Sequence, residues 1–278
     1  MSERLGEGPK GPFFMVHFAM MPPVLRRVFL LLLIAPVAIL GCKKDEDDEP
    51  QPQPQNSIPT PEQVLVNLRF IPREAGAGFT FGDSYITDGT GRDALIERIR
   101  ILFTDIRLTN ASATAIRTFP GKVVLWDSND PNALTPIGTV DAGSFAGVGL
   151  TIGLDDANNA TVPADHTGPP LSDQTLYVGS VSGYRFYSIE GRIDANDDGI
   201  VSSAEPTFTY ACITSAMRRN DQLYYNSSLA GSSSVVNIGL DVAGLLNGVN
   251  VMNDLNETGA TSLNAQLMSN LQTAIEEP

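Results

Sequence analysis

The chain has 278 residues and a formal net charge of −14, from 32 Asp and Glu against 18 Lys and Arg, and it contains two His, two Cys and one Trp. This composition argues against a nucleic-acid partner, because a phosphate backbone is bound by clustered basic residues. The two histidines also leave little material for general-base catalysis or for a multi-histidine metal centre.

Residues 1–41 have the order of segments that is typical of a signal peptide. Two arginines precede an almost unbroken apolar run over residues 28–40. That run has about 13 residues, fewer than the roughly 20 that a helix needs to cross a bilayer. It ends in Leu40-Gly41-Cys42, which resembles the lipobox of bacterial lipoproteins. We expect the thiol of Cys42 to be acylated and to anchor the mature chain to a membrane. The alternative is a buried cysteine after a short apolar segment.

Residues 1–19 add nothing that a signal peptide requires. A start at Met20 or Met21 would place a short basic segment directly before the apolar run, as is usual for such signals. We interpret residues 1–19 as an over-extended start, and a peptide from this segment in the precursor would contradict that interpretation.

Residues 42–61 have the composition of a solvated tether. Lys43 and Lys44 are followed by five consecutive acids and then by alternating Pro and Gln. Like charges repel and proline favours an extended backbone, so this segment is not expected to bury a core. Lysine followed by acids directly after the lipidated cysteine resembles the export signal of surface lipoproteins in Bacteroidetes. We expect an outer-membrane lipoprotein that either faces the periplasm or is exposed at the cell surface.

Residues 62–278 are predicted to form one all-β domain, an antiparallel β-sandwich. Short apolar or alternating runs are separated by clusters of Gly, Pro, Asn and Asp, which is the pattern of strands and turns. Helical segments do not alternate with these runs, which argues against a parallel sheet. The predicted strands are 64–70, 96–108, 122–126, 147–154, 183–193, 207–213 and 235–242, with weaker candidates at 78–82 and 223–225.

One helix is predicted near the C-terminus. Apolar residues recur at helical spacing from Leu263 to Ile275, directly after Thr261 and Ser262, and residues of these two types favour the N-cap position. We expect this helix to pack on the core of the domain rather than to bind a partner.

The most specific motif is a twelve-residue loop at residues 194–205. It fits the calcium-binding EF-hand formula at every defined position, including the glycine at position 6, Gly199. Val201 at position 8 supplies the apolar residue that fixes such a loop to its support. Several oxygen ligands from one short segment suit a hard divalent cation. The predicted Ca²⁺ ligands are the side chains of Asp194, Asn196, Asp198, Ser202 and Glu205 and the main-chain carbonyl of Ile200.

The segments on either side of loop 194–205 are typical of strands, whereas an EF-hand has helices there. Without a helix pair there is no groove to open, which favours a static, stabilising ion over a calcium sensor. Outside the cytoplasm calcium is about millimolar, so a weak site of roughly 10⁻⁴ to 10⁻³ M would still be occupied in part. The alternative is a surface turn that binds no ion.

Four segments occur in the order found in the MbnP-like copper-binding lipoproteins. They are 66–70, 99–108, 147–155 and, most specific, the nine residues from Gly183 to Gly191, which are similar to the family's Gly-Tyr-x-Phe-x-x-Leu-Glu-Gly motif. The resemblance covers most of residues 62–278. It implies an MbnP-like β-sandwich of metal-binding type.

The residues that the resemblance assigns to copper chemistry are replaced in this chain. The family has a Trp-x-Trp before its Gly-Tyr pair, but residues 176–182 contain no tryptophan, and the family's histidine after a strand phenylalanine corresponds to Ala211. A further histidine near the C-terminus is also missing. Cys212, a methionine and His166 could be imagined around Cu(I). However, a strand cysteine is commonly buried and a loop histidine exposed. We therefore expect a degenerate copper site and no copper. With Cys42 acylated, Cys212 has no disulfide partner.

No motif indicates an enzyme. The sequence lacks a Gly-x-Ser-x-Gly elbow, a phosphate-binding glycine loop and a His-Glu-x-x-His motif. The proximity of two carboxylates, as glycoside hydrolysis requires, is not readable from sequence. Glu190 belongs to the family motif, and we expect it to pair with Arg185 or Arg192. Two functions stay open: an MbnP-type metal-handling protein, and a calcium-stabilised surface module that binds a protein or glycan partner.

Overall fold

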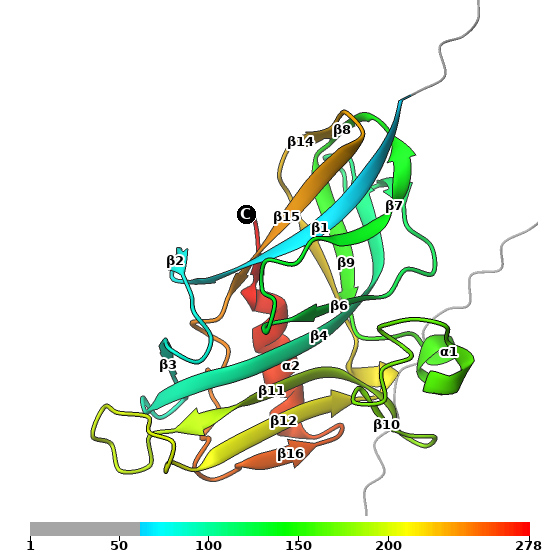
Figure 1. Cartoon of the computed structure of the whole chain (residues 1–278). Coiled ribbons are helices and arrows are strands. Elements are labelled where there is room, and N and C mark those ends of the chain that lie inside the picture. The colour runs from blue at the N-terminus through cyan, green and yellow to red at the C-terminus, as the bar shows by residue number, and fades with distance from the viewer. Residues whose placement is uncertain (1–61) are drawn as a thin grey trace, which may run out of the picture. The chain divides into compact units, whose positions relative to one another are not determined.

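The computed structural model describes residues 62–278, and Figure 1 shows their arrangement. The predicted signal peptide, the predicted lipidation site Cys42 and the predicted tether lie outside the described residues. Neither α-helix of the described part, one of 4 and one of 13 residues, is long and apolar enough to span a bilayer.

Two sheets form the framework of the described domain (Figure 1). The first has the order β17 (Ile275–Glu276), β15 (Ser233–Asp241), β1 (Gln63–Glu74), β2 (Ala77–Gly78), and β7 (Thr135–Asp141) also pairs with β1. The second has the order β13 (Arg219–Leu223), β9 (Gly147–Ile152), β4 (Asp93–Thr109), β11 (Gly183–Ile193), β12 (Thr207–Ile213), β16 (Asn256–Thr258).

Shorter elements complete the architecture. The strands that pair with β4 outside the main order are β3 (Tyr85–Thr87), β5 (Ala115–Thr118) and β6 (Val124–Asp127), while β10 (Tyr177–Gly179) pairs with β11. β8 (Gly143–Phe145) and β14 (Ser227–Leu229) form a separate pair. The helices are α1 (Asp156–Asn159) and α2 (Ser262–Ala274), with 3₁₀ turns at Pro163–Asp165 and Ser215–Met217.

The predicted all-β sandwich is confirmed, and two of its strand pairs are parallel. β1 pairs in parallel with β15, from Leu65 opposite Ser233 to Arg73 opposite Asp241. β12 pairs in parallel with the short β16. Among the other predictions, strands 183–193 and 207–213 match β11 and β12 at both ends. Segment 78–82 was predicted as a strand, but only its first residue belongs to β2, and segment 223–225 contributes only its first residue to β13.

Aromatic rings join the two sheets in the core. Phe70 of β1 stacks on Phe103 of β4 with their ring centroids 4.6 Å apart. Trp126 of β6 lies 6.2 Å from the ring of Phe70 and 5.8 Å from that of Phe81, and it is 3% exposed. Aromatic pairs at such distances add to the stabilisation from burial. This cluster explains why Phe81, on a turn, still packs against the core.

The predicted C-terminal helix is confirmed as α2. Thr261 caps its N-terminus, where the threonine hydroxyl accepts a hydrogen bond from the amide of Asn264 at 3.2 Å. Leu267, Met268 and Leu271 are buried against the domain. Ile275, expected to continue the helix, begins β17 and pairs with Leu240 of β15.

Candidate functional site

Loop 194–205 connects β11 to β12, as predicted from its flanks. The two strands pair with each other up to Arg192 opposite Thr207, directly before and after the loop. The loop begins at a buried residue, since Asp194 is 1% exposed. Val201 is also buried, whereas Ile200 is 61% exposed. Position 8 therefore holds the buried apolar residue of the loop.

The carboxylate of Asp194 organises the first half of the loop. Its two oxygens accept hydrogen bonds from the amides of Asp197 and Gly199, each at 2.7 Å, and a longer one from Asp198 at 3.4 Å. Gly199 has φ +80°, a conformation that favours glycine. Burial acts to raise the pKa of Asp194, but these amide hydrogen bonds and the nearby Arg92 outweigh it and lower the pKa below its ordinary value.

The other predicted ligand side chains also turn back onto loop amides. The side-chain oxygen of Asn196 accepts from the amide of Asp198 at 3.1 Å, and Asp198 accepts from the amide of Ile200 at 2.9 Å. Glu205, at the end of the loop, accepts a hydrogen bond from the amide of Ala195 at 3.1 Å, so the last residue of the loop contacts its second residue. These contacts hold oxygen-bearing side chains at loop positions 1, 3, 5 and 12 on a common backbone frame.

Ser202 has a more local contact. Its hydroxyl accepts a hydrogen bond from the amide of Ala204 at 3.3 Å. Within residues 62–278, no three His, Cys, Asp or Glu side chains are grouped closely enough to hold a metal ion. All six predicted ligands lie on this one loop. The carboxylates of the loop accept hydrogen bonds from backbone amides and do not form a three-acid cluster.

Two arginines outside the loop hold its ends, and the sequence analysis did not identify this role. Arg92 donates to the carbonyls of Asp194 and Ala195, both at 3.0 Å. Arg192 donates to the carbonyls of Ser203 and Glu205 at 2.9 and 3.2 Å, and pairs with Glu97 at 2.7 Å. Only the position of Arg192, two residues before the loop, could have indicated such a contact, because Arg92 is distant in sequence.

The residues considered as copper ligands, Cys212 and His166, lie on different kinds of element, one in a strand and the other after a 3₁₀ turn. Cys212 is fully buried, and burial raises the pKa of its thiol to about 12. His166 follows the 3₁₀ turn Pro163–Asp165 and is half-buried rather than exposed, with its Nε2 2.7 Å from the hydroxyl of Thr161. Ala211, beside Cys212, is buried as well.

A pair of tyrosines lies where β10 meets β11. Tyr177 of β10 lies opposite Tyr184 of β11, and their ring centroids are 5.2 Å apart. The hydroxyl of Tyr184 donates to the carbonyl of Leu171 at 2.8 Å. These rings pack and form hydrogen bonds within the domain, and neither brings a metal ligand to the site.

Glu190 does not pair with Arg185 or Arg192, which corrects the prediction from sequence. It forms an ion pair of 3.5 Å with Arg100 on the neighbouring strand β4. Arg100 is 7% exposed and also donates to the hydroxyls of Ser188 and Thr175. In the register of β11 with β4, Glu190 lies opposite Arg98. Arg100 is two residues further along β4, so the ion pair is a diagonal cross-strand contact rather than one along β11.

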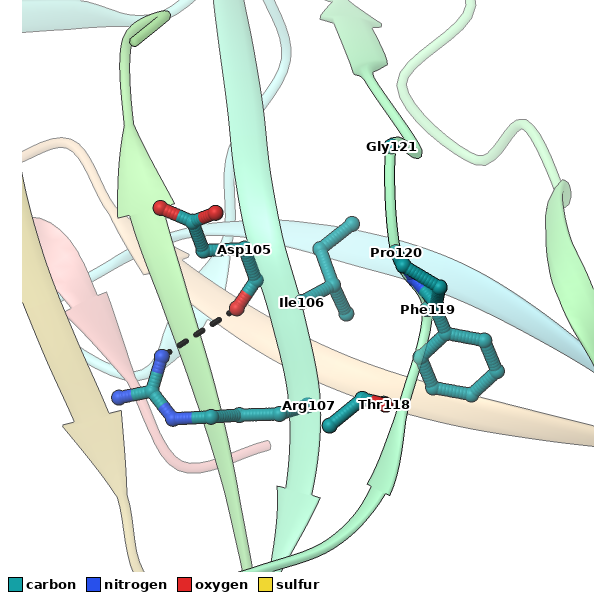
Figure 2. A pocket seen from close by; sticks show the side chains of 7 residues that line it. All are labelled: Asp105, Ile106, Arg107, Thr118, Phe119, Pro120 and Gly121. Carbon is teal, nitrogen blue, oxygen red and sulfur yellow. Dashed lines mark hydrogen bonds between the residues drawn. The ribbon is translucent and has the colours of Figure 1, made fainter.

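A cavity of about 220 Å³ lies beside an irregularity in β4 (Figure 2). Asp105 has φ +51° there, and the register with β9 shifts between Thr104 and Arg107. The carboxylate of Asp105 points away from Ile106 and Phe119 (Figure 2) and accepts from Thr151 and Arg218. The side of the cavity at Ile106 and Phe119 is therefore apolar. The carboxylate of Asp105 forms its hydrogen bonds with neighbouring residues of the domain instead.

Comparison with known proteins identifies the family. The MbnP family model matches residues 63–268. No curated protein matches the sequence of this chain. Among solved structures, the chain is similar to MbnP from Methylosinus trichosporium, with 15% sequence identity, a TM-score of 0.46 and coverage of 72% of this chain and 82% of that chain. Because the family model spans most of the domain, the chain belongs to the MbnP family.

Proposed function

We propose that the chain is a membrane-anchored lipoprotein of the MbnP family whose domain binds one calcium ion through loop 194–205. The hydrogen-bond frame of this loop carries the proposal. The backbone amides that donate to Asp194, Asn196, Asp198 and Glu205 hold these side chains in place on the loop. Carboxylate oxygens have lone pairs beyond those used by one amide, so they can still coordinate a cation.

The donor set suits calcium better than a transition metal. Asp194, Asn196, Asp198 and Glu205 offer only oxygen, as does the carbonyl of Ile200, and calcium takes six to eight oxygen ligands. Copper prefers imidazole or sulfur ligands, which this loop lacks. Arg92 and Arg192 donate their hydrogen bonds at the loop to main-chain carbonyls. Neither arginine therefore occupies the carboxylate oxygens of Asp194 and Glu205.

The role proposed for the ion is structural. Loop 194–205 lies between two paired strands, and strands offer no helix pair that could swing open. A bound ion would offset the repulsion among Asp194, Asp198 and Glu205 and would stabilise the folded domain through its binding free energy.

The family's copper site is proposed to be degenerate. Ala211 stands at the position of the family histidine, and Cys212 beside it is buried with a thiol whose pKa burial raises to about 12. Such a thiol stays protonated near neutral pH, and the thiolate is the form that binds metals. His166 lies in a loop beside Thr161.

The membrane anchor is proposed from the sequence alone. The apolar run that ends in Leu40-Gly41-Cys42 supports acylation of Cys42. Mass spectrometry of the mature chain tests this: a lipidated N-terminal cysteine is expected, and an intact, unmodified Cys42 preceded by the leader would refute it.

Thermal unfolding of the purified chain, followed by the fluorescence of Trp126, tests the calcium site. With 2 mM calcium and a dissociation constant of roughly 10⁻⁴ M, binding adds about 2 kcal/mol. For a domain of this size we expect the melting temperature to be about 4 to 7 °C higher than in EGTA. Equal melting temperatures in calcium and EGTA would refute the proposal.

Two variants locate the effect. Glu205→Gln keeps an oxygen for the amide of Ala195 but loses the carboxylate, so the calcium-dependent rise should disappear. Asp197→Asn is the matched control, because it removes one charge at a loop position with no assigned ligand. Metal analysis of the protein completes the test: calcium is expected, and stoichiometric copper would overturn the degenerate copper site.

A further inference from the structure

Two cavities meet at Lys122, on the loop between β5 and β6. One, of about 200 Å³, is lined by Lys122 and His166 together with residues 168–171. The other, of about 260 Å³, is lined by Lys122, Phe119, Ile137 and Thr139. Residues 62–278 contain one lysine and one histidine, and the fold brings them to the same cavity although they lie far apart in sequence.

This cavity pair is free of acids in an acidic domain. Residues 62–278 contain 25 Asp and Glu against 12 Lys and Arg, yet no carboxylate lines either cavity. The nearest acid in sequence to His166 is Asp165, and its carboxylate accepts a hydrogen bond from the amide of Val162 at 3.1 Å. The local charge at Lys122 is therefore positive.

The ammonium group of Lys122 has no hydrogen bond or ion pair with any residue that the structure describes. The arginines at the calcium loop and at Glu190 differ, because each has carbonyl or carboxylate partners. A lysine beside a cavity with no acid in its lining provides a point charge for an anion, as lysine does in many phosphate sites.

The hydrogen bonds around Thr161 determine which nitrogen of the His166 ring carries the proton and which can accept a hydrogen bond from a ligand. The hydroxyl of Thr161 donates its single hydrogen to the carbonyl of Asn158 at 2.7 Å. The contact of 2.7 Å between Thr161 and Nε2 of His166 must then use the proton on Nε2. In the neutral ring Nδ1 is consequently the acceptor, and it suits a ligand that carries an acidic O–H.

We propose that Lys122 and His166 bind a phosphate group. Monohydrogen phosphate has both features that the two side chains require, an oxyanion for the ammonium of Lys122 and an O–H for Nδ1 of His166. Sulfate has the oxyanion without the O–H near neutral pH. The apolar walls at Phe119 and Ile137 in the adjoining cavity provide space for the organic part of a phosphomonoester. The site shares no residue with loop 194–205.

The test uses the full chain carrying His17→Asn, so that His166 is its single histidine and gives one set of imidazole NMR signals. Sodium phosphate, sodium sulfate and phenyl phosphate are titrated at constant ionic strength. Phosphate is expected to shift the His166 signals in a saturable way and to bind more tightly than sulfate. Tighter binding of phenyl phosphate than of phosphate would identify an ester as the ligand, and weaker binding would identify free phosphate.

Matched variants separate a site from general attraction of anions. Lys122→Met should weaken phosphate binding by roughly tenfold or more, the loss of one charged contact, whereas Lys122→Arg should largely retain it. Arg69→Met removes the same charge from the first sheet and should leave the affinity unchanged. Trp126 emission confirms that each variant is folded. The proposal is overturned if phosphate gives no saturable shift, or if Lys122→Met binds as the parent does.

Discussion

The hydroxyl of Tyr187 donates a 2.7 Å hydrogen bond to the side-chain oxygen of Asn264, and both residues are buried. The amide nitrogen of Asn264 donates in turn to the carbonyls of Ala211 at 3.1 Å and Gly259 at 3.0 Å. This network connects β11, β12 and α2 inside the core. Burial raises the pKa of Tyr187 well above its ordinary value, so the phenol keeps its proton.

Removing the hydroxyl of Tyr187 should weaken the domain measurably. Tyr187→Phe leaves the oxygen of Asn264 buried without this donor, and we expect a loss of about 1–2 kcal/mol in the free energy of unfolding. Asn264→Leu should cost more, because the carbonyl of Gly259 also loses this donor and that of Ala211 keeps only the amide of Gly259. Guanidinium unfolding followed by Trp126 fluorescence measures both. Thr273→Ala, at an exposed helix position, is the control, and a Tyr187→Phe variant as stable as the parent would contradict the assignment.

Arg92 should stabilise loop 194–205 whether or not an ion is bound. Its guanidinium bonds to two adjacent carbonyls at the start of the loop, and hydrogen bonds from a charged group contribute about 1.5–3 kcal/mol. We expect Arg92→Met to lower stability in EGTA by about that amount. Both bonds come from one guanidinium nitrogen, Nη1. Arg92→Lys should recover only part of the stability, because the lysine side chain is shorter and its ammonium does not reach the position of Nη1. Equal stability of Arg92→Met and the parent in EGTA would show that the clamp has no energetic role.

Asp88 should contribute stability that acid removes. Its carboxylate accepts from the amide and hydroxyl of Thr90, both at 2.7 Å, and from the amides of Arg92 and Val251. Burial acts to raise the pKa of Asp88, but these hydrogen bonds outweigh burial and lower the pKa below 3.8. The folded state therefore holds its proton less tightly than the unfolded state.

The sign of the pH effect follows from that difference. Stabilisation by Asp88 is fully present above about pH 3.8, the value of an ordinary aspartate, and is lost as the pH falls through the lower value of the folded state. Asp88→Asn should therefore be less stable than the parent at pH 7, with a smaller gap at pH 2. Urea unfolding at both values measures this, with the exposed Asp83→Asn as control. A gap that widens in acid would be inconsistent with the lowered pKa.

The thiol of Cys212 should be unreactive in the folded protein. It is fully buried and its pKa is raised to about 12 by burial, so little thiolate exists at pH 8. In a chain carrying Cys42→Ser it is the one thiol in the sequence. A colorimetric disulfide reagent should label it only after denaturant is added. Rapid labelling of the native protein would place Cys212 at an accessible position instead.

Much of the second sheet, which contains β4, β9, β11 and β12, could be predicted from the sequence, because these strands have unbroken apolar or alternating patterns. β11 and β12 match their predicted bounds, and the cap at Thr261 marked the start of α2. β7, with Pro136 and Gly138, and β8, with Gly143, were missed. Proline and glycine are depleted in strands, so their pairing depends on neighbours that the local pattern does not contain.

Contacts between distant segments explain the other differences. The sequence places Glu190 two residues from Arg192, but the pairing of β11 with β4 brings it diagonally across to Arg100. Likewise, the loop residues 194–205 could be predicted from their spacing, whereas Arg92 reaches the loop only through the folded chain. Lys122 and His166 line one cavity for the same reason, because the folded chain brings together two segments that are distant in sequence.

The parallel pairing of β1 with β15 has a consequence for the timing of folding. The first strand of the domain finds one of its neighbours only when residues 233–241 have been made. Contacts between ends of a chain are slow to form, because a long loop must close first. A chain that stops before Ser233 leaves one edge of β1 unpaired and open to aggregation. Synthesis of this domain thus has a vulnerable interval that ends only near its last residues.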